Sequence, residues 1–505
     1  VPMMETTLST RQLTEGGFGR IKVASDGEIK LPEQVALNVQ PGGSVELKGS
    51  QVTVGGQITA PGGTIKLTTR ASTSSRTTDH ELNVNAPALL STRGLWTNDV
   101  SGTGGAPFAP IVTKGGSITL DSYADLTVAA GSRLDVSGGG WVNGAGKLQG
   151  GAGGSITLKV GDQQVGEAIR SNSRLTVDGS MQGYGLAGGG SLTLEAGQVR
   201  IGGTPQAGDS RALLQLDAGF FQRGGFSKYT IKSRDGLNVT TGTTVQPLVE
   251  TLQIAGDFRQ RITGSDLFDF TTRQLPLPAD RAAATLDLQA TNINFGKVEI
   301  EDGARIATDI GGTINLSAAR QIIVDGTLEA PAGNIALSLT GASDQGYLGD
   351  QYIWLGANSQ LLATGAARTR TDYNGFVTGD ILAGGQISLT ASQGYVVTET
   401  GSRMDVSGPR GRVDIVSRGG APTATVESRE IASDAGGISI KAAEGMLLYG
   451  DWRAFGGSST ARGGSLGIEM TTPARNGGSY PTGERRIVVS NDHGNTPFPT
   501  GLVPG

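Results

Sequence analysis

One short unit recurs along the chain: a pair of glycines followed by apolar residues that alternate with polar ones. It occurs nine times, as GGSVELK (42–48), GGTIKLT (62–68), GGSITLD (115–121), GGSITLK (153–159), GGSLTLE (189–195), GGTINLS (311–317), GGQISLT (384–390), GGISIKA (436–442) and GGSLGIE (463–469). The alternation has the period of a β-strand, and paired glycines permit the positive φ and close backbone approach of a tight corner. The copies lie about 20–26 residues apart, or further where a loop intervenes, and self-similarity at that spacing indicates a solenoid.

Residues 115–140 show how one turn of this solenoid is built. Three apolar pairs follow one another, Ile118 with Leu120, Leu126 with Val128, and Leu134 with Val136. Gly, Ser, Ala and Asp separate the pairs and favour turns. Because a strand with one apolar face cannot bury that face alone, three such strands should form the sides of one coil on which further coils stack. We therefore predict an all-β fold, a right-handed parallel β-helix with loop insertions, with about 16 coils of about 24 residues.

Interruptions of the repeat define the expected organisation. It consists of a β-helix shaft over 1–202 with an insertion at 71–112, an interrupted region over 203–285 with a protruding insertion at 248–284, a shaft over 286–470 with an insertion at 341–380, and a Pro/Gly-rich irregular tail over 471–505. The insertions lack the strand alternation, so we expect them to protrude from the shaft.

Charge and cysteine content exclude several kinds of function. The 41 Lys and Arg residues are interleaved with 46 Asp and Glu residues for a net charge of −5, so no partner nucleic acid is expected. The absence of Cys removes disulfides, thiolate metal sites and cysteine nucleophiles. No run reaches the ~18 apolar residues of a membrane span, and the first residues lack a signal-peptide pattern. We expect the chain to be a piece of a longer protein.

Outward carboxylates are the candidates for chemistry. Glu299 and Glu301, with Asp302 beside them, share one face of a predicted strand and could bind calcium or act as an acid/base pair. The alternative is a solvated strand face, and the same two interpretations apply to Asp266 and Asp269.

Two other sets of polar residues favour structure over chemistry. Asp135 and Asp405 recur in matching SRLDVSG (132–138) and SRMDVSG (402–408) units, which indicates local ion pairs with Arg133 and Arg403. The two histidines, His80 and His493, stand alone, so neither a metal site nor a cofactor is expected. The glycines of GYGLAGGG (183–190) precede a strand, whereas a dinucleotide site requires a helix.

Aromatic residues in the insertions are the candidate surface-binding residues. They are Trp96, Phe108, Tyr347, Tyr352, Trp354 and Trp452. Exposed rings of this kind could stack on sugars or form a protein contact. The alternative is that they pack the insertions against the shaft.

Several motifs resemble those of a known family. The glycine-led strands, SRLDVSG and SRMDVSG, APGGTI (60–65) and FFQRGGFSKYTIKSRDGLNV (220–239) are similar to the central region of filamentous haemagglutinin-type exoproteins, the adhesins of two-partner secretion. The likeness covers roughly residues 16–247 and 286–470. It implies an extracellular or cell-surface β-helical rod that is exported through an outer-membrane β-barrel transporter, and this segment would be internal shaft.

The expected function is structural. We expect a rod segment of a large secreted bacterial adhesin or filament that mediates attachment, biofilm formation or assembly without catalysis. Its host-cell, glycan or matrix ligand is not identified by the sequence, and unpaired shaft ends would permit self-association. The alternative is a polysaccharide-active lyase or hydrolase that uses an outward carboxylate cluster beside the insertions.

Overall fold

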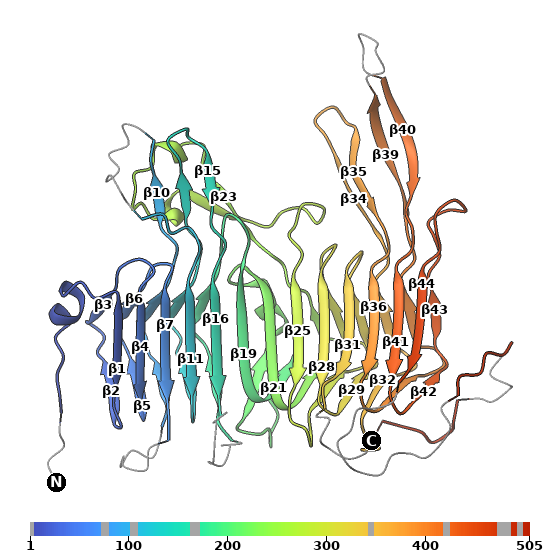
Figure 1. Ribbon diagram of the computed structural model, residues 1–505, viewed down its shortest axis with the longest axis horizontal. Coiled ribbons are helices and arrows are strands. Elements are labelled where there is room, and N and C mark those ends of the chain that lie inside the picture. Colours follow the sequence, from blue (N-terminus) through green and yellow to red (C-terminus); the bar gives the residue numbers. More distant parts are fainter. Residues whose placement is uncertain are drawn as a thin grey trace.

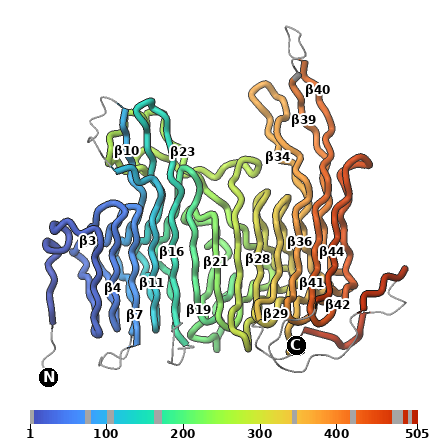
Figure 2. The backbone as a smooth tube through the Cα atoms, viewed as in Figure 1, coloured from blue at the N-terminus to red at the C-terminus, as the bar shows by residue number. Residues whose placement is uncertain are grey.

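The protein is an elongated shaft of stacked parallel strands with two protrusions on one side (Figure 1). The computed structural model describes residues 5–71, 80–100, 110–161, 172–341, 348–417, 425–471, 486–491 and 498–504. The chain order follows the long axis of the shaft, as the steady change of colour in Figure 2 shows. The predicted fold class, a parallel β-helix with insertions, is confirmed.

Face 1 of the shaft contains the glycine-led strands. Within the described residues, thirteen strands pair in succession: β1 (Arg20–Ala24), β4 (Ser44–Gly49), β7 (Thr64–Thr69), β11 (Ser117–Ser122), β16 (Ser155–Val160), β19 (Gly190–Ile201), β21 (Phe226–Val239), β25 (Thr285–Ala290), β28 (Thr313–Ala318), β31 (Asn334–Leu339), β36 (Gln386–Ala391), β41 (Gly437–Ala442) and β44 (Ser465–Met470). The described residues thus contain thirteen face 1 strands, fewer than the expected number of about 16 coils.

Face 2 follows face 1 around the first corner of each coil. Its strands are β2 (Glu28–Leu31), β5 (Gln51–Val54), β8 (Leu82–Val84), β12 (Leu126–Val128), β17 (Leu175–Val177), β20 (Leu213–Leu216), the C-terminal parts of β19 and β21, β26 (Lys297–Ile300), β29 (Gln321–Val324), β32 (Tyr352–Leu355), β37 (Tyr395–Thr398) and β42 (Gly445–Leu448).

Face 3 closes the coil. In its first part it has β3 (Ala36–Asn38), β6 (Gln57–Thr59), β9 (Leu89–Ser91), β13 (Arg133–Asp135) and β18 (Ser180–Gln182). In its second part it has β22 (Thr244–Val245), β27 (Arg305–Ala307), β30 (Thr327–Glu329), β33 (Gln360–Leu362), β38 (Arg403–Asp405) and β43 (Asp451–Arg453).

The order of strand pairing in the shaft becomes irregular where the two parts of face 3 meet. β19 and β21 run without a break from face 1 to face 2, and β20 pairs with β19 on the side opposite β21, although it follows β19 in sequence. The short helix η2 (Ala218–Gln222) places Phe221 in the core beside Phe226 and Tyr229. Within the predicted interrupted region 203–285, residues up to 247 therefore belong to the shaft.

Inward aliphatic side chains form continuous ladders through the core. Ile65, Ile118, Ile156 and Leu192 are in register on successive strands of face 1 and almost fully buried. Each such side chain contributes about 1.5–3 kcal/mol relative to remaining in water. The glycine corners permit the coils to stack closely, since a Cβ on Gly154 would lie 1.9 Å from the backbone carbonyl oxygen of Gly116 in the preceding coil.

The first protrusion, the lateral subdomain, combines segments that are distant in sequence. It contains β10 (Trp96–Asn98), β14 (Gly140–Val142), β15 (Leu148–Gly150), the hairpin of β23 (Thr251–Ile254) and β24 (Thr271–Gln274), and the short helices η3 (Phe258–Gln260) and η4 (Leu267–Asp269). Figure 1 shows β23 in the same protrusion as β10 and β15. The predicted insertion at 71–112 was too broad, because β8 and β9 lie within it and continue faces 2 and 3.

The second protrusion, the hairpin arm, consists of two antiparallel hairpins. One joins β34 (Ala366–Thr371) to β35 (Val377–Leu382), and the other joins β39 (Arg410–Ser417) to β40 (Thr425–Ala432). The predicted insertion at 341–380 was misplaced, because β32 and β33 within it belong to the shaft. The second hairpin lies where continuous shaft was expected.

The two ends of the shaft differ. A single turn of π-helix, η1 (Arg11–Glu15), lies at the N-terminal end and packs Leu13 against the core. At the C-terminal end, Leu466 and Ile468 of β44 are 55% and 38% exposed. The described residues of the tail, 471, 486–491 and 498–504, contain no helix or strand.

Candidate functional site

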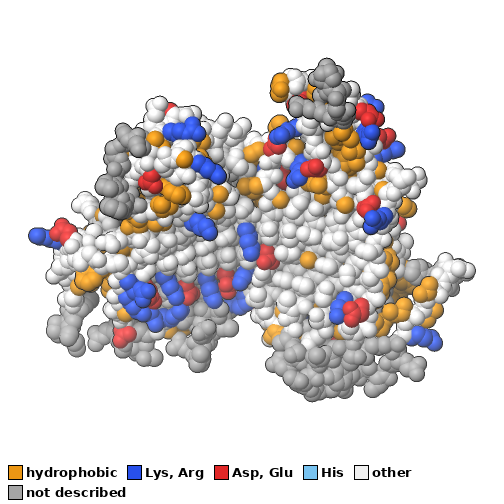
Figure 3. Space-filling model, turned by 45° about the horizontal axis from the view of Figure 1, so that its top comes forward, with side chains coloured by type: hydrophobic (Ala, Val, Ile, Leu, Met, Phe, Trp, Pro, Cys, Tyr) orange, Lys and Arg blue, Asp and Glu red, His pale blue; other side chains and the backbone are white. Residues whose placement is uncertain are grey.

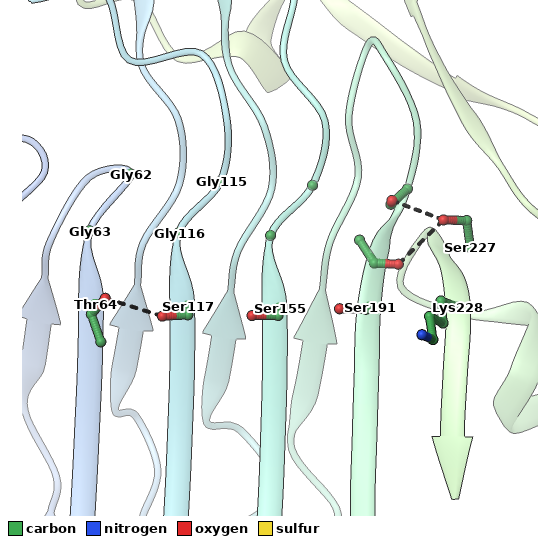
Figure 4. Close-up of a pocket in the computed structure, with 14 residues that line it drawn as sticks. Gly62, Gly63, Thr64, Gly115, Gly116, Ser117, Ser155, Ser191, Ser227 and Lys228 are labelled. Atoms are coloured by element: carbon green, nitrogen blue, oxygen red, sulfur yellow. Dashed lines mark hydrogen bonds between the residues drawn. The ribbon is translucent and has the colours of Figure 1, made fainter. Parts of the chain in front are cut away.

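The stacked corners at the start of face 1 line a shallow groove of about 530 Å³. Figure 4 shows Thr64, Ser117, Ser155 and Ser191 on neighbouring strands, with Lys228 at one end. The Ser117 hydroxyl donates to Thr64 Oγ1 at 3.2 Å, and the Ser227 hydroxyl donates to the carbonyl oxygen of Gly189 at 2.9 Å.

The groove supplies hydroxyl groups and one ammonium group. Its backbone amides are already used between coils: Ser117 N–H donates to Gly63 and Ser155 N–H donates to Gly116. Its lining, all in the described part of the chain, includes no carboxylate or imidazole. The groove can therefore contact a polar ligand through hydroxyl groups and one ammonium group.

Trp96, one of the candidate surface-binding aromatics, is in the core of the lateral subdomain. It is 2% exposed, its indole N–H donates to the carbonyl oxygen of Arg261 at 3.2 Å, and its ring meets Phe270 edge-on at 4.8 Å between centroids. Stacking on a ligand is therefore excluded, and the packing alternative applies to this residue.

Tyr352 and Trp354 are also buried, at 7% and 3% exposure. They point outward from face 2 but are covered by neighbouring apolar residues and by the tail, whose Phe498 ring lies 6.1 Å from the Trp354 ring. Trp354 Nε1 donates to Glu399 at 2.6 Å. The interpretation of these two residues as exposed aromatics is therefore wrong. Their burial could not be predicted, because the sequence does not show that the tail returns over this face.

The other predicted aromatics have different positions. Trp452 is half-buried on β43 and packs against the end of the core. Phe108 and Tyr347 lie outside the described residues, as does His493. His80 is buried at a corner, where its ring contacts Tyr123 edge-on at 5.6 Å.

The carboxylates Glu299 and Glu301 have separate partners. Glu299 pairs with Lys297 at 2.7 Å. Glu301 accepts hydrogen bonds from Asn238 Nδ2 at 2.6 Å and from the backbone N–H of Thr241 at 2.7 Å. Burial would raise the pKa of Glu301, but these hydrogen bonds outweigh burial and lower it. Glu301 therefore anchors a corner as a carboxylate and is not suited to act as a general acid.

Asp266 connects the lateral subdomain to the shaft. It accepts two hydrogen bonds from the Arg93 guanidinium, at 2.5 and 3.0 Å, which hold the pKa of its carboxyl below the usual range. Arg93 also lies over the ring of Phe268, 4.7 Å from its centroid, and 3.7 Å from Asp135. This arginine was not identified in the sequence, where nothing marks it as different from the other arginines.

The repeated Asp135 and Asp405 have the structural role that repetition indicated. Each forms an ion pair with the arginine two residues earlier, and each accepts a hydrogen bond from the backbone N–H of the serine two residues later, at 3.0 and 2.9 Å. Both carboxylates are buried. The predicted ion pairs are confirmed, and the SR[LM]DVSG unit is a corner motif after face 3.

Charges on the shaft surface are mixed in sign. Figure 3 shows Lys and Arg side chains interspersed with Asp and Glu over the N-terminal part of face 1. Several pairs bridge neighbouring strands, among them Lys22 with Glu46 at 3.4 Å and Lys159 with Glu195 at 3.7 Å. In the described residues, no three His, Asp or Glu side chains form a group that could hold a metal ion. The same residues include no helix of sufficient length and hydrophobicity to cross a membrane.

The hairpin arm is a surface that the sequence reading missed. Its two hairpins are joined by a hydrogen bond from Val377 N–H to Asp414 Oδ2 at 2.7 Å. Apolar side chains remain exposed along β39 and β40, including Val416 at 53% and Val426 at 40%, and Figure 3 shows such side chains gathered on the arm. Two alternating segments separated by a Gly- and Pro-containing stretch are typical of a hairpin and could have predicted it.

The structure defines an elongated parallel β-helix with a lateral subdomain and a hairpin arm. No protein-family model, curated protein or solved structure matches the chain.

Proposed function

We propose that this chain is a rod segment of a large secreted bacterial surface adhesin or filament, and that it acts as a spacer without catalysis. The observation that carries the proposal is the ladder of thirteen parallel strands that the described residues form on face 1, which share one aliphatic core. Between β1 and β44, each strand of face 1 pairs with the face 1 strand of the coil before it and of the coil after it, so length and stiffness follow directly from repetition.

Three of the carboxylates support the structural function over a polysaccharide-active enzyme. Glu301 and Asp405 are on different coils of the shaft and Asp266 is in the lateral subdomain, and each is held as an anion by its own hydrogen-bond donors. A glycosidase requires two carboxyl groups that face one substrate with their pKa values shifted apart. The pKa values of these three carboxyls are all lowered.

The cellular setting belongs to the same proposal. An adhesin of two-partner secretion would be extracellular or on the cell surface, exported unfolded through an outer-membrane β-barrel transporter. A fold stabilised by stacked strands, in a chain with no Cys, can form after export without disulfide chemistry. The hairpin arm and the lateral subdomain would be the parts that contact a host-cell, glycan or matrix ligand, because they project from the shaft.

The test is cryo-electron microscopy of the parent protein purified from cells, together with a deletion of one coil. Removing residues 313–333 joins Gly312 to Asn334, which occupies the same register position as Thr313. A spacer should form a continuous rod that is shorter by about 4.8 Å and still supports attachment. The matched control removes one residue fewer, 313–332, which joins Gly312 to Gly333 and shifts the following strand by one residue relative to its neighbours, so it should not fold.

Two outcomes would contradict the proposal. One is a compact particle in which this segment lines a deep, carboxylate-containing groove. The other is cleavage of an acidic polysaccharide by the purified chain, abolished by E301Q.

A further inference from the structure

No described strand pairs with the outer edge of the last coil at the C-terminal end of the shaft (Figure 1). Within the described residues, β42 pairs with β37 alone and β44 pairs with β41 alone. Leu466 is 55% exposed, whereas Ile438 in the same register position of the preceding coil is 4% exposed. The inward apolar side chains of the last coil are therefore only partly buried.

The last four strands of face 2 differ from the earlier ones in their outward residue. In β29, β32, β37 and β42 this residue is apolar and in register, and the four residues are Ile323, Trp354, Val397 and Leu447. The corresponding outward residue is polar in β5, β12 and β26, where it is Thr53, Thr127 and Glu299. We call the four apolar residues the outer strip. In all four strands an apolar inward residue precedes the outward one, and in β29, β32 and β42 a second apolar residue follows it, whereas Thr398 follows it in β37. Two or three consecutive apolar residues therefore mark a face 2 strand in this part of the shaft.

The tail contains one more copy of that pattern. The face 2 strands with their following residue are QIIVD (321–325), YIWLG (352–356), YVVTE (395–399) and GMLLY (445–449), and the tail contains RIVVS (486–490). In the structure this segment is irregular, and Ile487, Val488 and Val489 are 54%, 67% and 94% exposed.

The position of the segment in the chain also fits a face 2 strand. Residues 471–485 separate it from β44, the last strand of face 1. Connections of similar length, residues 70–81, 161–174 and 340–351, already join face 1 to face 2 in three earlier coils. A long connection at this corner is therefore a repeated feature of the shaft.

We infer that the open edge of β42 is a strand-docking surface and that its occupant is Arg486–Ser490 of the same chain. In this arrangement Ile487 lies beside Met446, Val488 beside Leu447, and Val489 beside Leu448. Ile487 and Val489 then cover the half-buried inward residues of β42, and Val488 extends the outer strip. With this edge occupied, another chain cannot pair with it, so self-association through β42 is blocked.

Disulfide trapping in the cysteine-free chain tests the register directly. In-register residues on neighbouring parallel strands are about 4.8 Å apart, within the Cα separation of a disulfide of about 4.4–6.8 Å. The variant L447C/V488C should form an intramolecular disulfide under mild oxidation, detected by mass spectrometry. V397C/L447C joins two strands that the structure already pairs and is the positive control. L447C/V489C shifts the register by one residue, to a side chain that would point inward, and is the matched negative control.

The possible outcomes distinguish between docking of the same chain and docking of a second copy at the edge of β42. Efficient cross-linking of L447C/V488C, at least tenfold faster than that of L447C/V489C, supports the inferred docking. Equal rates for the two pairs overturn it, because they show an undocked segment. A disulfide between two molecules overturns it in favour of a second copy. Slow amide exchange at residues 487–489 in the unmodified chain is an independent readout, and exchange as fast as in an unfolded peptide contradicts the inference.

Discussion

The burial of Trp96 gives a quantitative test of the lateral subdomain. Trp96→Ala removes a side chain that is 2% exposed from the core of the subdomain. Truncation of a buried large aromatic residue costs about 3–5 kcal/mol, which includes its edge-on contact with Phe270. The lost hydrogen bond adds little, because Asn98 Nδ2 also donates to the Arg261 carbonyl, at 2.7 Å. We therefore expect about 4 kcal/mol of local destabilisation.

The assay is hydrogen exchange followed by mass spectrometry. A loss of about 4 kcal/mol raises the population of the locally open state about 10³-fold. The amides of β23 and β24 should therefore exchange about 10³-fold faster. The exchange rates of the amides of β28 and β31, which lie in the shaft, should not change. The matched control is Trp141→Ala on β14, whose indole N–H donates to Asp99 at 2.7 Å at the surface, and this change should cost below about 1 kcal/mol. Equal exchange in the two variants would refute the assigned packing of Trp96.

Three further perturbations test other features. Gly154→Ala places a Cβ 1.9 Å from a backbone carbonyl oxygen and should abolish protection from exchange in the coils on either side, whereas Gly467→Ala, with no atom within 4 Å of its Cβ, should be neutral in the same experiment. The pKa of Asp266 is lowered in the folded state. The ionised Asp266 side chain therefore stabilises the lateral subdomain fully at a pH above the ordinary pKa of an aspartate, and this stabilisation is lost as the pH falls through the lowered pKa. Limited proteolysis at decreasing pH should show this loss below the ordinary pKa of an aspartate, and Asp266→Asn should remove this contribution to the pH dependence. Trp354→Ala should release the tail that packs through Phe498, and unchanged proteolysis of the tail would contradict the contact.

The strands of the shaft could be predicted because their determinants are local. Alternation at every second residue selects the buried side of a strand, and a glycine pair permits the corner that precedes it, so GGSITLD at 115–121 specifies its own conformation. The ion pair of Asp135 with Arg133 was predictable for the same reason, since both residues lie two apart on one strand. The order in which β19, β20 and β21 pair was not predictable, because nothing local prevents β20 from lying on the other side of β19.

The candidate site depended on contacts between distant residues. The core of the lateral subdomain combines Trp96, Val142 and Leu267, whose positions in the sequence do not indicate that they meet. Burial of Trp354 depends on a tail that returns over face 2, and Asp266 is paired with an arginine more than a hundred residues away. By itself, the sequence determined the class of fold and the repeated corners, because these arise from periodicity. Which side chains are exposed and which carboxylates are paired was decided only by tertiary structure, because burial and ion pairing depend on what covers a residue.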